Sequence, residues 1–240
     1  MSKKETAYKF LSVDELRNSY LIARLDEGDI YLDDDSKPNG VLVNNGEIIS
    51  MRGNVEVLIK MMKKIEPGQY RFHSVDSSSF EAAERYVEDI DDSPTWMLFR
   101  PKEAFGNLET EVDKLNLNDV SVINEHWGLG ESDSSDYIAH RIKTGPAYGI
   151  RRDDELVAWV LTHYITDSAM CLGFLHVKEC WRRRGFAKDL TDAICQDAEK
   201  QNLTPVVDIF QDNVASLSLS KSLGFEKIGE NHWFEGTIPE

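Results

Sequence analysis

The sequence predicts an α/β protein built on a mixed sheet. The first observation is a series of three strand candidates at residues 147–151, 156–162 and 169–177, separated by short polar turns. The second is the spacing of apolar residues from Phe186 onward, at about every 3.6 positions, which is typical of an amphipathic helix. The third is the continued alternation, in which another strand candidate precedes another helix.

The last two elements of this series lie at residues 206–210 and 213–223. The strand candidate follows Pro205, and Gly224 ends the helix, as glycine commonly does. Two short helices are expected ahead of the strands, and a glycine–proline pair at 145–146 closes the second of them. Apolar residues at helical spacing mark them: Val120, Ile123 and Trp127 in one, Ile138 and Ile142 in the other.

The first half of the chain carries a hairpin signal and two helix signals. Asn44-Asn45-Gly46 lies between two apolar runs, as in a hairpin turn. Asn54 and Asp76 each precede a stretch with helical spacing. The single histidine of this half, His73, is expected to be an ordinary strand or loop residue. No metal-ligand spacing and no glycine-rich phosphate loop occurs here, so we expect a structural or substrate-shaping domain.

Composition excludes several classes of partner. The chain has 27 Lys and Arg against 43 Asp and Glu, a formal net charge of -16. A protein that binds the phosphate backbone of nucleic acid needs a basic face. We therefore expect neither nucleic acid nor an anionic membrane as a partner. The longest apolar run, at residues 156–161, is too short to span a bilayer.

The three cysteines predict neither a disulfide framework nor a zinc site. Cys171, Cys180 and Cys195 are odd in number and form no C-x-x-C pair. The N-terminal residues lack the apolar stretch of a secretory signal. We expect a cytoplasmic protein that holds no metal. The oligomeric state stays open, a homo-oligomer included.

A domain division is expected near residues 101–117, where Pro101 precedes a stretch containing Gly, Asn and Glu. This division gives an N-terminal domain over residues 1–105 and a second domain over residues 106–240.

A basic, glycine-containing turn joins the third strand candidate to the helix behind it. Its sequence is Trp181-Arg182-Arg183-Arg184-Gly185-Phe186-Ala187-Lys188. The first N–H groups of a helix lack backbone partners, and the helix dipole favours negative charge there. Gly185 lets the backbone approach a ligand. The turn is either an anion-binding site or a basic helix start that faces solvent, and it does not fit the G-x-x-x-x-G-K-[ST] loop of nucleoside triphosphate hydrolases.

Two blocks of residues extend this pattern. The first is Leu175-His176-Val177 followed by Arg182-x-x-Gly185-x-Ala187. The second is Asn213-x-x-Ser216 ahead of Leu223-Gly224-Phe225. In spacing and order the two blocks resemble the GNAT superfamily of N-acetyltransferases, over residues 117–235. Asn124-x-x-Trp127 and the layout of the whole chain are similar, more narrowly, to the glycine N-acyltransferase branch, whose members carry a degenerate half ahead of the catalytic one.

The resemblance implies a GNAT-like acyltransferase fold preceded by a degenerate GNAT-like half, with acetyl-CoA as co-substrate. The backbone around His176 would bond the pantetheine arm, and the Val177 N–H would point at the acyl carbonyl and stabilise the oxyanion. The basic turn would supply N–H groups to the pyrophosphate. The residues implied for the cofactor are Leu175, His176, Val177, Arg182, Arg183, Arg184, Gly185, Phe186, Ala187, Lys188, Asn213 and Ser216.

The chain departs from the family pattern at two positions. Where many members carry a tyrosine that protonates the leaving thiolate, this chain has Ser220, a poorer acid than a phenol. The glycine N-acyltransferase branch also tends to lack that tyrosine. Where several members carry a Glu or His base, this chain has Cys171. Ser220 and His176 are the candidate catalytic residues, and His163, His176 and a water held by Asp208 are the open candidates for the base.

Alternative readings of these residues stay open. His163 and His176 fall in strand candidates and could each be a packed, hydrogen-bonded histidine. Cys171 as a covalent nucleophile would need a base within reach, whereas a free cysteine is usually a small buried apolar residue.

Three functions remain at this stage. The first is transfer of an acyl group, most simply acetyl, from CoA to a primary amine of a small molecule or amino acid by direct attack. The second is a non-catalytic module that binds CoA or acyl-CoA as a sensor. The third is a scaffold with a vestigial site.

Overall fold

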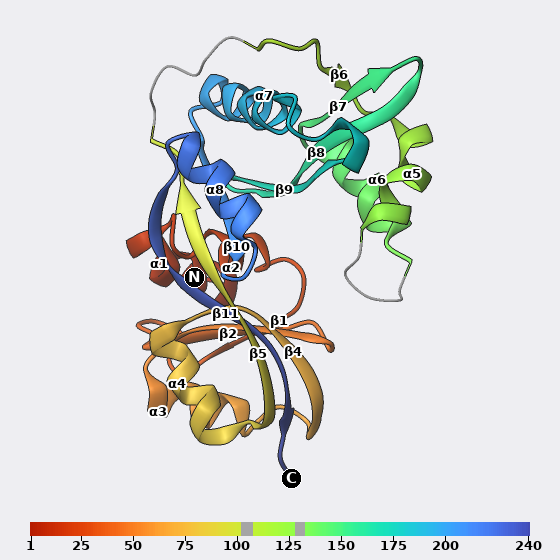
Figure 1. Cartoon of the computed structure of the whole chain (residues 1–240). Coiled ribbons are helices and arrows are strands. Elements are labelled where there is room, and N and C mark those ends of the chain that lie inside the picture. Colours follow the sequence, from red (N-terminus) through yellow and green to blue (C-terminus); the bar gives the residue numbers. More distant parts are fainter. Residues whose placement is uncertain (102–107, 128–132) are drawn as a thin grey trace. The chain divides into compact units, whose positions relative to one another are not determined.

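The computed structural model describes residues 1–101, 108–127 and 133–240 (Figure 1). By compactness the described chain divides into two units. Unit 1 comprises Met1–Leu98, Asp208–Val214 and Lys227–Glu240, and unit 2 comprises Phe99–Val207 and Ala215–Glu226. The predicted division into residues 1–105 and 106–240 stays a prediction. In the described ranges, no helix is both long and apolar enough to cross a membrane.

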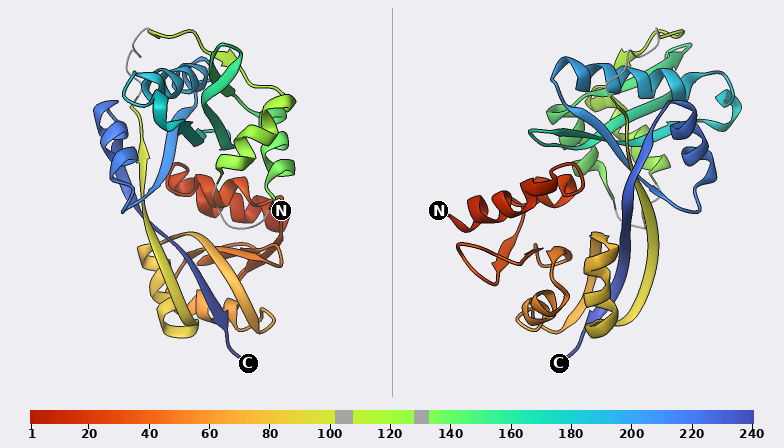
Figure 2. Two further views of the ribbon diagram at one scale, coloured as in Figure 1. Left: turned by 45° about the vertical axis from the view of Figure 1, so that its right-hand side comes forward. Right: turned by 90° about the vertical axis from the view of Figure 1, so that its left-hand side faces the viewer.

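Unit 1 is a mixed sheet with helices on both faces. Its strands run in the order β1-β2-β3-β4-β11-β5, and β5 and β11 run side by side (Figure 2). The strands are β1 (Asp29–Leu32), β2 (Gly40–Asn44), β3 (Ile48–Gly53), β4 (Gly68–Asp76), β5 (Glu88–Phe99) and β11 (Glu226–Ile238). The helices are α1 (Lys3–Leu11), α2 (Ser19–Ala23), α3 (Val55–Met62) and α4 (Ser77–Tyr86).

Strand β2 shows how period-two alternation places these layers. Leu42 packs in a core with Leu58 of α3 and Ala82 of α4. Its neighbours Val41 and Val43 pack in a separate core with residues of α1 and α2. Successive side chains of a strand point to opposite faces, so one buried strand joins two cores.

Three local predictions for the first half are confirmed. Strands β2 and β3 form an antiparallel hairpin across Asn45 and Gly46. The Asn54 side chain accepts hydrogen bonds from the first N–H groups of α3, and Asp76 accepts one from Ser79 of α4. Both are N-cap interactions, which satisfy donors that the helix itself leaves free.

Unit 2 is a sheet in the order β10-β9-β8-β7-β6. Its strands are β6 (Asp113–Lys114), β7 (Ala147–Arg152), β8 (Glu155–Ile165), β9 (Ala169–Val177) and β10 (Thr204–Phe210), which ends in unit 1. Its helices are α5 (Val120–His126), α6 (Ser135–Thr144), α7 (Phe186–Lys200) and α8 (Val214–Ser222), which begins at the last residue of unit 1. All neighbours are antiparallel except β9 and β10, which are parallel.

Both faces of the central strand β8 are buried. Trp159 and Leu161 pack with Ile123 of α5 and Ile138 of α6. The alternating residue Val160 is buried as well, and α7 packs against β7, β8 and β9. The predicted strands and helices of this half are confirmed, with β8 extending to Ile165 and α5 ending one residue before Trp127.

The order of elements occurs twice along the chain. Two helices, three strands, a helix, a strand, a helix and a strand appear as α1 to β5 and again as α5 to β11, when the short β6 is set aside. In each series the third and fourth strands are parallel neighbours. The two halves therefore share one order of elements.

An ion pair inside unit 2 anchors α7. Arg100 Nη1 lies 2.5 Å from Asp192 Oδ1, and the Asp192 side chain is 1% exposed. The Lys188 ammonium lies 3.4 Å from the other Asp192 oxygen.

We expect Asp192→Asn to destabilise the protein by about 3–5 kcal/mol, because breaking a buried pair leaves a buried charge uncompensated. The matched control is Lys200→Met on the same helix. It removes an exposed pair with Asp197, which is worth less than about 1 kcal/mol. Urea unfolding measures both, and equal midpoints for the two variants would contradict the assignment.

Candidate active site

The parallel strands β9 and β10 pair over only three residues. Ala169, Met170 and Cys171 pair with Thr204, Pro205 and Val206. Beyond Cys171, β9 continues to Val177 with no further register to β10 in the described chain. Backbone N–H and C=O groups seek partners, so an edge of β9 can accept an extended ligand as an added strand.

The predicted residues Leu175, His176 and Val177 lie on this separated part of β9. Val177 and Ala158 of β8 are register partners on the other edge. These three residues thus lie where β9 has no register partner in β10, and their role in binding a cofactor stays a prediction.

The basic turn begins at the last residue of a short 3-10 turn, Glu179–Trp181, and extends through Lys188 in the first turn of α7. Arg183 and Gly185 both have left-handed backbone conformations, with φ of 63° and 85°. The Arg182 Nε–H donates to the Val177 carbonyl over 3.1 Å, which ties the turn to the end of β9. Arg182, Arg183, Arg184 and Gly185 are all exposed.

Burial of Phe186 and two cation–π contacts hold the turn in place. Phe186 is 5% exposed, and the Arg152 guanidinium lies 4.8 Å from its ring centre. The Arg184 guanidinium lies 4.6 Å from the centre of the Trp181 ring. The N–H groups of the first turn of α7, from Phe186 through Lys188, have no intrahelical acceptors. Positive charge and free N–H donors therefore coincide at the N-terminus of α7, as an anion site requires.

The remaining predicted residues lie on or beside α8. Ser216 is half-buried, and Ser220 is 8% exposed. The Ser220 carbonyl accepts from the Phe225 N–H over 3.0 Å, which closes the helix. Asn213 is exposed and belongs to unit 1. The roles of all three stay predictions.

Two β-bulges distort the pairing of β8 with β9. Between the pairs Leu161–Gly173 and Trp159–His176, β9 has two residues where β8 has one. Between Thr162–Leu172 and Tyr164–Cys171, β8 has the extra residue His163 and β9 has none. In the first bulge Phe174 takes a φ of 55°, which is costly for a bulky side chain. Bulges commonly redirect side chains beside active sites.

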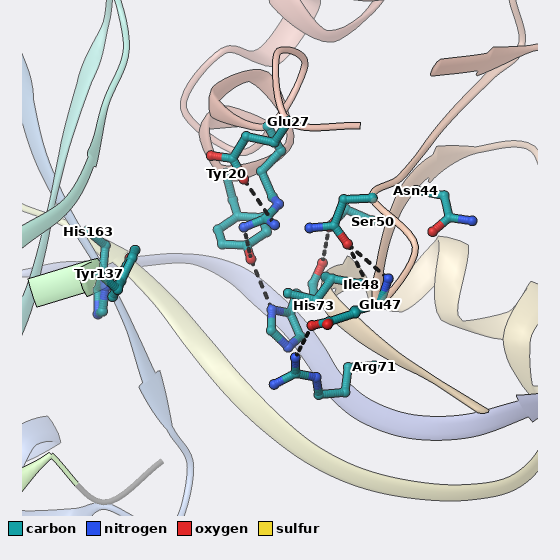
Figure 3. Close-up of polar contacts among 12 residues, drawn as sticks. Tyr20, Glu27, Asn44, Glu47, Ile48, Ser50, Arg71, His73, Tyr137 and His163 are labelled. Atoms are coloured by element: carbon teal, nitrogen blue, oxygen red, sulfur yellow. Dashed lines mark hydrogen bonds and ion pairs between the residues drawn. The ribbon is translucent and has the colours of Figure 1, made fainter. Parts of the chain in front are cut away.

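The two bulges bring His163 and Phe174 together. Their ring centres are 4.7 Å apart. The His163 ring lies directly over Gly173, where an added Cβ would come within 2.0 Å of it. On its other side, His163 Nδ1 is 3.2 Å from the Tyr137 hydroxyl of α6 (Figure 3). Burial, and then the Arg141 charge, lower the pKa of His163 to about 4.

The second histidine of β9 has a different setting. His176 stacks on Trp159 at 4.6 Å, and its ring centre is 5.0 Å from that of His126 on α5. Burial lowers the pKa of His176, and the neighbouring His126, Arg182 and Lys178 lower it further. His176 is half-buried, so both histidines of the site are held in the neutral form at neutral pH.

Cys171 is 3% exposed, and its thiol donates to the Leu172 carbonyl over 3.6 Å. A buried thiol of this kind is expected to be inert. Among the residues that the structure describes, no group of three or more His, Cys, Asp or Glu could hold a metal ion.

Unit 1 contains a histidine with a similar local setting. His73 lies in β4, and its Nδ1 is 3.0 Å from the Tyr20 hydroxyl (Figure 3). It stacks on Trp233 at 4.4 Å. Burial, and then the charges of Arg24 and Arg71, lower its pKa to about 3. His73 is thus a packed strand residue, one of the two outcomes expected for it.

Residues 147–234 match a family model described as FR47-like protein, which covers less than half of the chain. No curated protein matches the sequence.

Solved structures extend the likeness to both halves. A GCN5-related N-acetyltransferase from Kribbella flavida shares 11% identity and a TM-score of 0.63, with 94% of this chain and 95% of that chain covered. A GCN5-related N-acetyltransferase-like protein from Streptococcus suis shares 16% identity and a TM-score of 0.55 over 96% and 99%. The fold is that of the GNAT acetyltransferases. A Drosophila protein of similar structure has 21% identity and a TM-score of 0.66, with 83% of this chain and 74% of that chain covered.

With the GNAT fold in view, two parts of the site were missing from the sequence prediction. Tyr137 and Gly173 carried no motif, and their importance arises only from the His163 ring that lies between them. Pro146 and the helical spacing of α6 were the only signals near Tyr137. From the GNAT fold alone one could have predicted that α6 lies near β8. The bulge that turns His163 toward Tyr137 could not have been predicted in this way.

The protonation of His163 is directly measurable. In a titration followed by NMR of the imidazole C–H signals, we expect His163 to titrate near pH 4 and His73 near pH 3. Because these values lie below the usual pKa of about 6.5, the unfolded chain takes up protons first as the pH falls. His163 therefore lowers stability between about pH 6.5 and 4, and His73 lowers it between about pH 6.5 and 3. His163→Gln and His73→Gln assign the signals, and a His163 midpoint near 6.5 would contradict its burial.

Proposed function

We propose that this protein transfers an acyl group, most simply acetyl, from CoA to a primary amine by direct attack of the amine on the thioester. One observation carries the proposal. The unpaired edge of β9 leads directly, through the Arg182–Val177 hydrogen bond, to a cationic turn with free N–H groups. An extended polar arm that ends in a pyrophosphate matches this sequence of sites.

The residues fit acyl-CoA without a metal. The backbone from Leu175 to Val177 would bind the pantetheine arm, and the turn from Arg182 to Lys188 would bind the pyrophosphate. The Val177 N–H would stabilise the oxyanion of the tetrahedral intermediate. Asn213 and Ser216 would contribute further polar contacts, and Ser220 is the candidate proton donor to the thiolate. We place the reaction in the cytoplasm.

The acceptor we propose is a small amine or amino acid. The net charge of -16 disfavours acidic protein acceptors and draws cationic amines toward the protein. The repeated order of elements supports a degenerate GNAT-like first half, as in the glycine N-acyltransferase branch. Neither nucleic acid nor membrane is proposed as a partner.

The primary test is a thermal shift with acetyl-CoA, CoA, ATP and NAD. A ligand at 100 times its dissociation constant adds about 2.7 kcal/mol to stability, or roughly 5–10 °C for a chain of this size. We expect acetyl-CoA and CoA alone to give this shift, and thiol release with a panel of primary amines to follow. Binding without thiol release would identify a CoA-binding module, and no binding would identify a scaffold.

We expect Gly185→Glu to abolish the acetyl-CoA shift, because it places a side chain and a negative charge at the proposed pyrophosphate site. Gly224→Glu is the matched control. Both glycines have positive φ, 85° and 78°, and at both an added Cβ meets no atom within 4 Å. Each substitution therefore introduces the same backbone strain of about 1–2 kcal/mol. If calorimetry gave the same acetyl-CoA affinity for the two variants, the assignment of the pyrophosphate site to this turn would be wrong.

We expect Cys171→Ala to keep most of the thiol-release activity, since the thiol is buried and the amine attacks the thioester directly. A loss of about three orders of magnitude in a correctly folded variant would instead indicate an acyl-cysteine intermediate.

A further inference from the structure

We propose that His163 is the proton acceptor of this acyl transfer and that Tyr137 positions it. The inference rests on the proposed function and names a residue for the step that the departure at Cys171 leaves unassigned.

The first ground is the arrangement of the two ring nitrogens. Nδ1 is held by the Tyr137 hydroxyl. Nε2 lies within 2.1 Å of the place that a Cβ on Gly173 would occupy, and within the described ranges it has no hydrogen-bond partner. When Nδ1–H donates to the tyrosine oxygen, the lone pair is on Nε2. A base whose second nitrogen is fixed by another group is the arrangement that enzymes use to orient a catalytic histidine.

The second ground is position along β9. Gly173 lies two residues past Cys171, the last residue paired with β10, and four residues before Val177. His163 Nε2 therefore lies against β9 at the level where β9 has just separated from β10, close in sequence to the residues assigned to the acyl-CoA arm.

The third ground is the local cost of placing this ring. Two adjacent strands each carry a bulge, and Phe174 adopts a left-handed conformation to do so. A side chain at position 173 would displace the imidazole. Packing an apolar core against this sheet would require neither bulge. The strained backbone and the bare Gly173 both serve to set one imidazole beside the strand edge.

The charged and titratable groups around His163 keep it a neutral proton acceptor. Helix α6 contributes Tyr137 and Arg141, and the positive charge of Arg141 opposes protonation. Phe174 of β9 and Trp127 beyond α5 contribute uncharged rings. The titratable groups on β9 are the thiol of Cys171, at the neighbouring register pair, and the imidazole of His176.

The proposed step is balanced as follows. The amine nitrogen attacks the thioester carbonyl carbon, a C–N bond forms, and the carbonyl π pair moves onto oxygen. The nitrogen, now positively charged and more acidic, gives its proton to His163 Nε2. The C–O double bond then re-forms, the C–S bond breaks, and the leaving thiolate takes a proton from Ser220. Solvent returns a proton to Ser220 and takes up the one that His163 accepted, so that both groups are restored. The products are an amide and CoA. A weak base is sufficient here, because the proton comes from the positively charged nitrogen of the intermediate. That nitrogen is a stronger acid than the free ammonium ion.

The competing histidine is placed less well for this role. His176 is stacked on Trp159 and lies beside His126. Its ring is not bonded to an orienting hydroxyl or carboxylate in the described chain. Its backbone, by contrast, belongs to the edge that would bind the acyl-CoA arm.

The test compares three variants, with thiol release measured from saturating acetyl-CoA. The acceptor is the fastest amine in a panel that includes glycine. His163→Asn removes the base, and we expect a loss of about 10²–10⁴-fold in kcat. Tyr137→Phe keeps the ring packing and removes the orienting oxygen, with an expected loss of about 10-fold or more. His73→Asn is the matched control, because His73 is also a buried, tyrosine-bonded strand histidine, and it is expected to keep wild-type activity.

The pH dependence separates a chemical role from a structural one. Hydroxide replaces the missing base in His163→Asn, so the ratio of its rate to the wild-type rate should rise with pH. The ionisation of the amine cancels in this ratio. A constant ratio, or a rate within threefold of wild type, would overturn the inference. If His163→Asn does not fold, Tyr137→Phe still decides: an unchanged rate overturns the positioning role and the inference with it.

Acetyl-CoA binding keeps the two proposals distinguishable. We expect the same thermal shift in wild type and His163→Asn. No shift in wild type would refute the proposed function. A shift without thiol release from any amine would refute the transfer and the proton acceptor, and leave the CoA site standing.

Discussion

The separation of β9 from β10 after three residue pairs is the constraint on which the candidate site depends. Parallel strands inside a sheet normally satisfy each other along their whole length, because unpaired backbone groups are costly. Here β9 runs on to Val177 with one edge open, and the helix that follows begins with free N–H groups among positive charges. Strand edge and helix terminus offer complementary polar groups to one long ligand. The ion pair of Arg100 with Asp192 matters to this site because it holds α7, and therefore its N-terminus, against the rest of unit 2.

The bulges in β8 and β9 show a second use of broken pairing. At the open edge, unpaired backbone groups remain available to a ligand. At the bulges, the distorted backbone changes the direction in which side chains point. His163 and Phe174 both reach the face covered by α5 and α6 through these irregularities. The two devices lie within a few residues of each other on one strand. Pairing of β9 with β10 ends at Cys171, and from there to Val177 its pairing with β8 is interrupted by two bulges.

Sequence reasoning reached those features whose causes are local. Apolar spacing through Phe186, Leu190 and Ile194 is a property of one helix, so α7 was predictable, and so was Gly185 in the turn before it. The bulge at His163 is a property of two strands in register, and no single segment encodes it. Strand β11 was also missed, because its alternation is irregular and several positions are only half-buried. Strand β5 was missed as well, because it contains Pro94 and a proline argues against an interior strand. The GNAT fold was recognisable from motifs, while the candidate base depended on tertiary contacts.

The place of β11 in unit 1 has a consequence for how the chain folds. This strand, Glu226–Ile238, lies between β4 and β5, which are formed by residues 68–99. During synthesis the first half emerges long before the strand that must enter the middle of its sheet. Until then β4 and β5 each lack the partner strand β11, and the edges that pair with it stay exposed. Contacts of such high sequence separation slow folding and favour association of incomplete chains. The sheet of unit 1 therefore cannot close before residues 226–238 have left the ribosome.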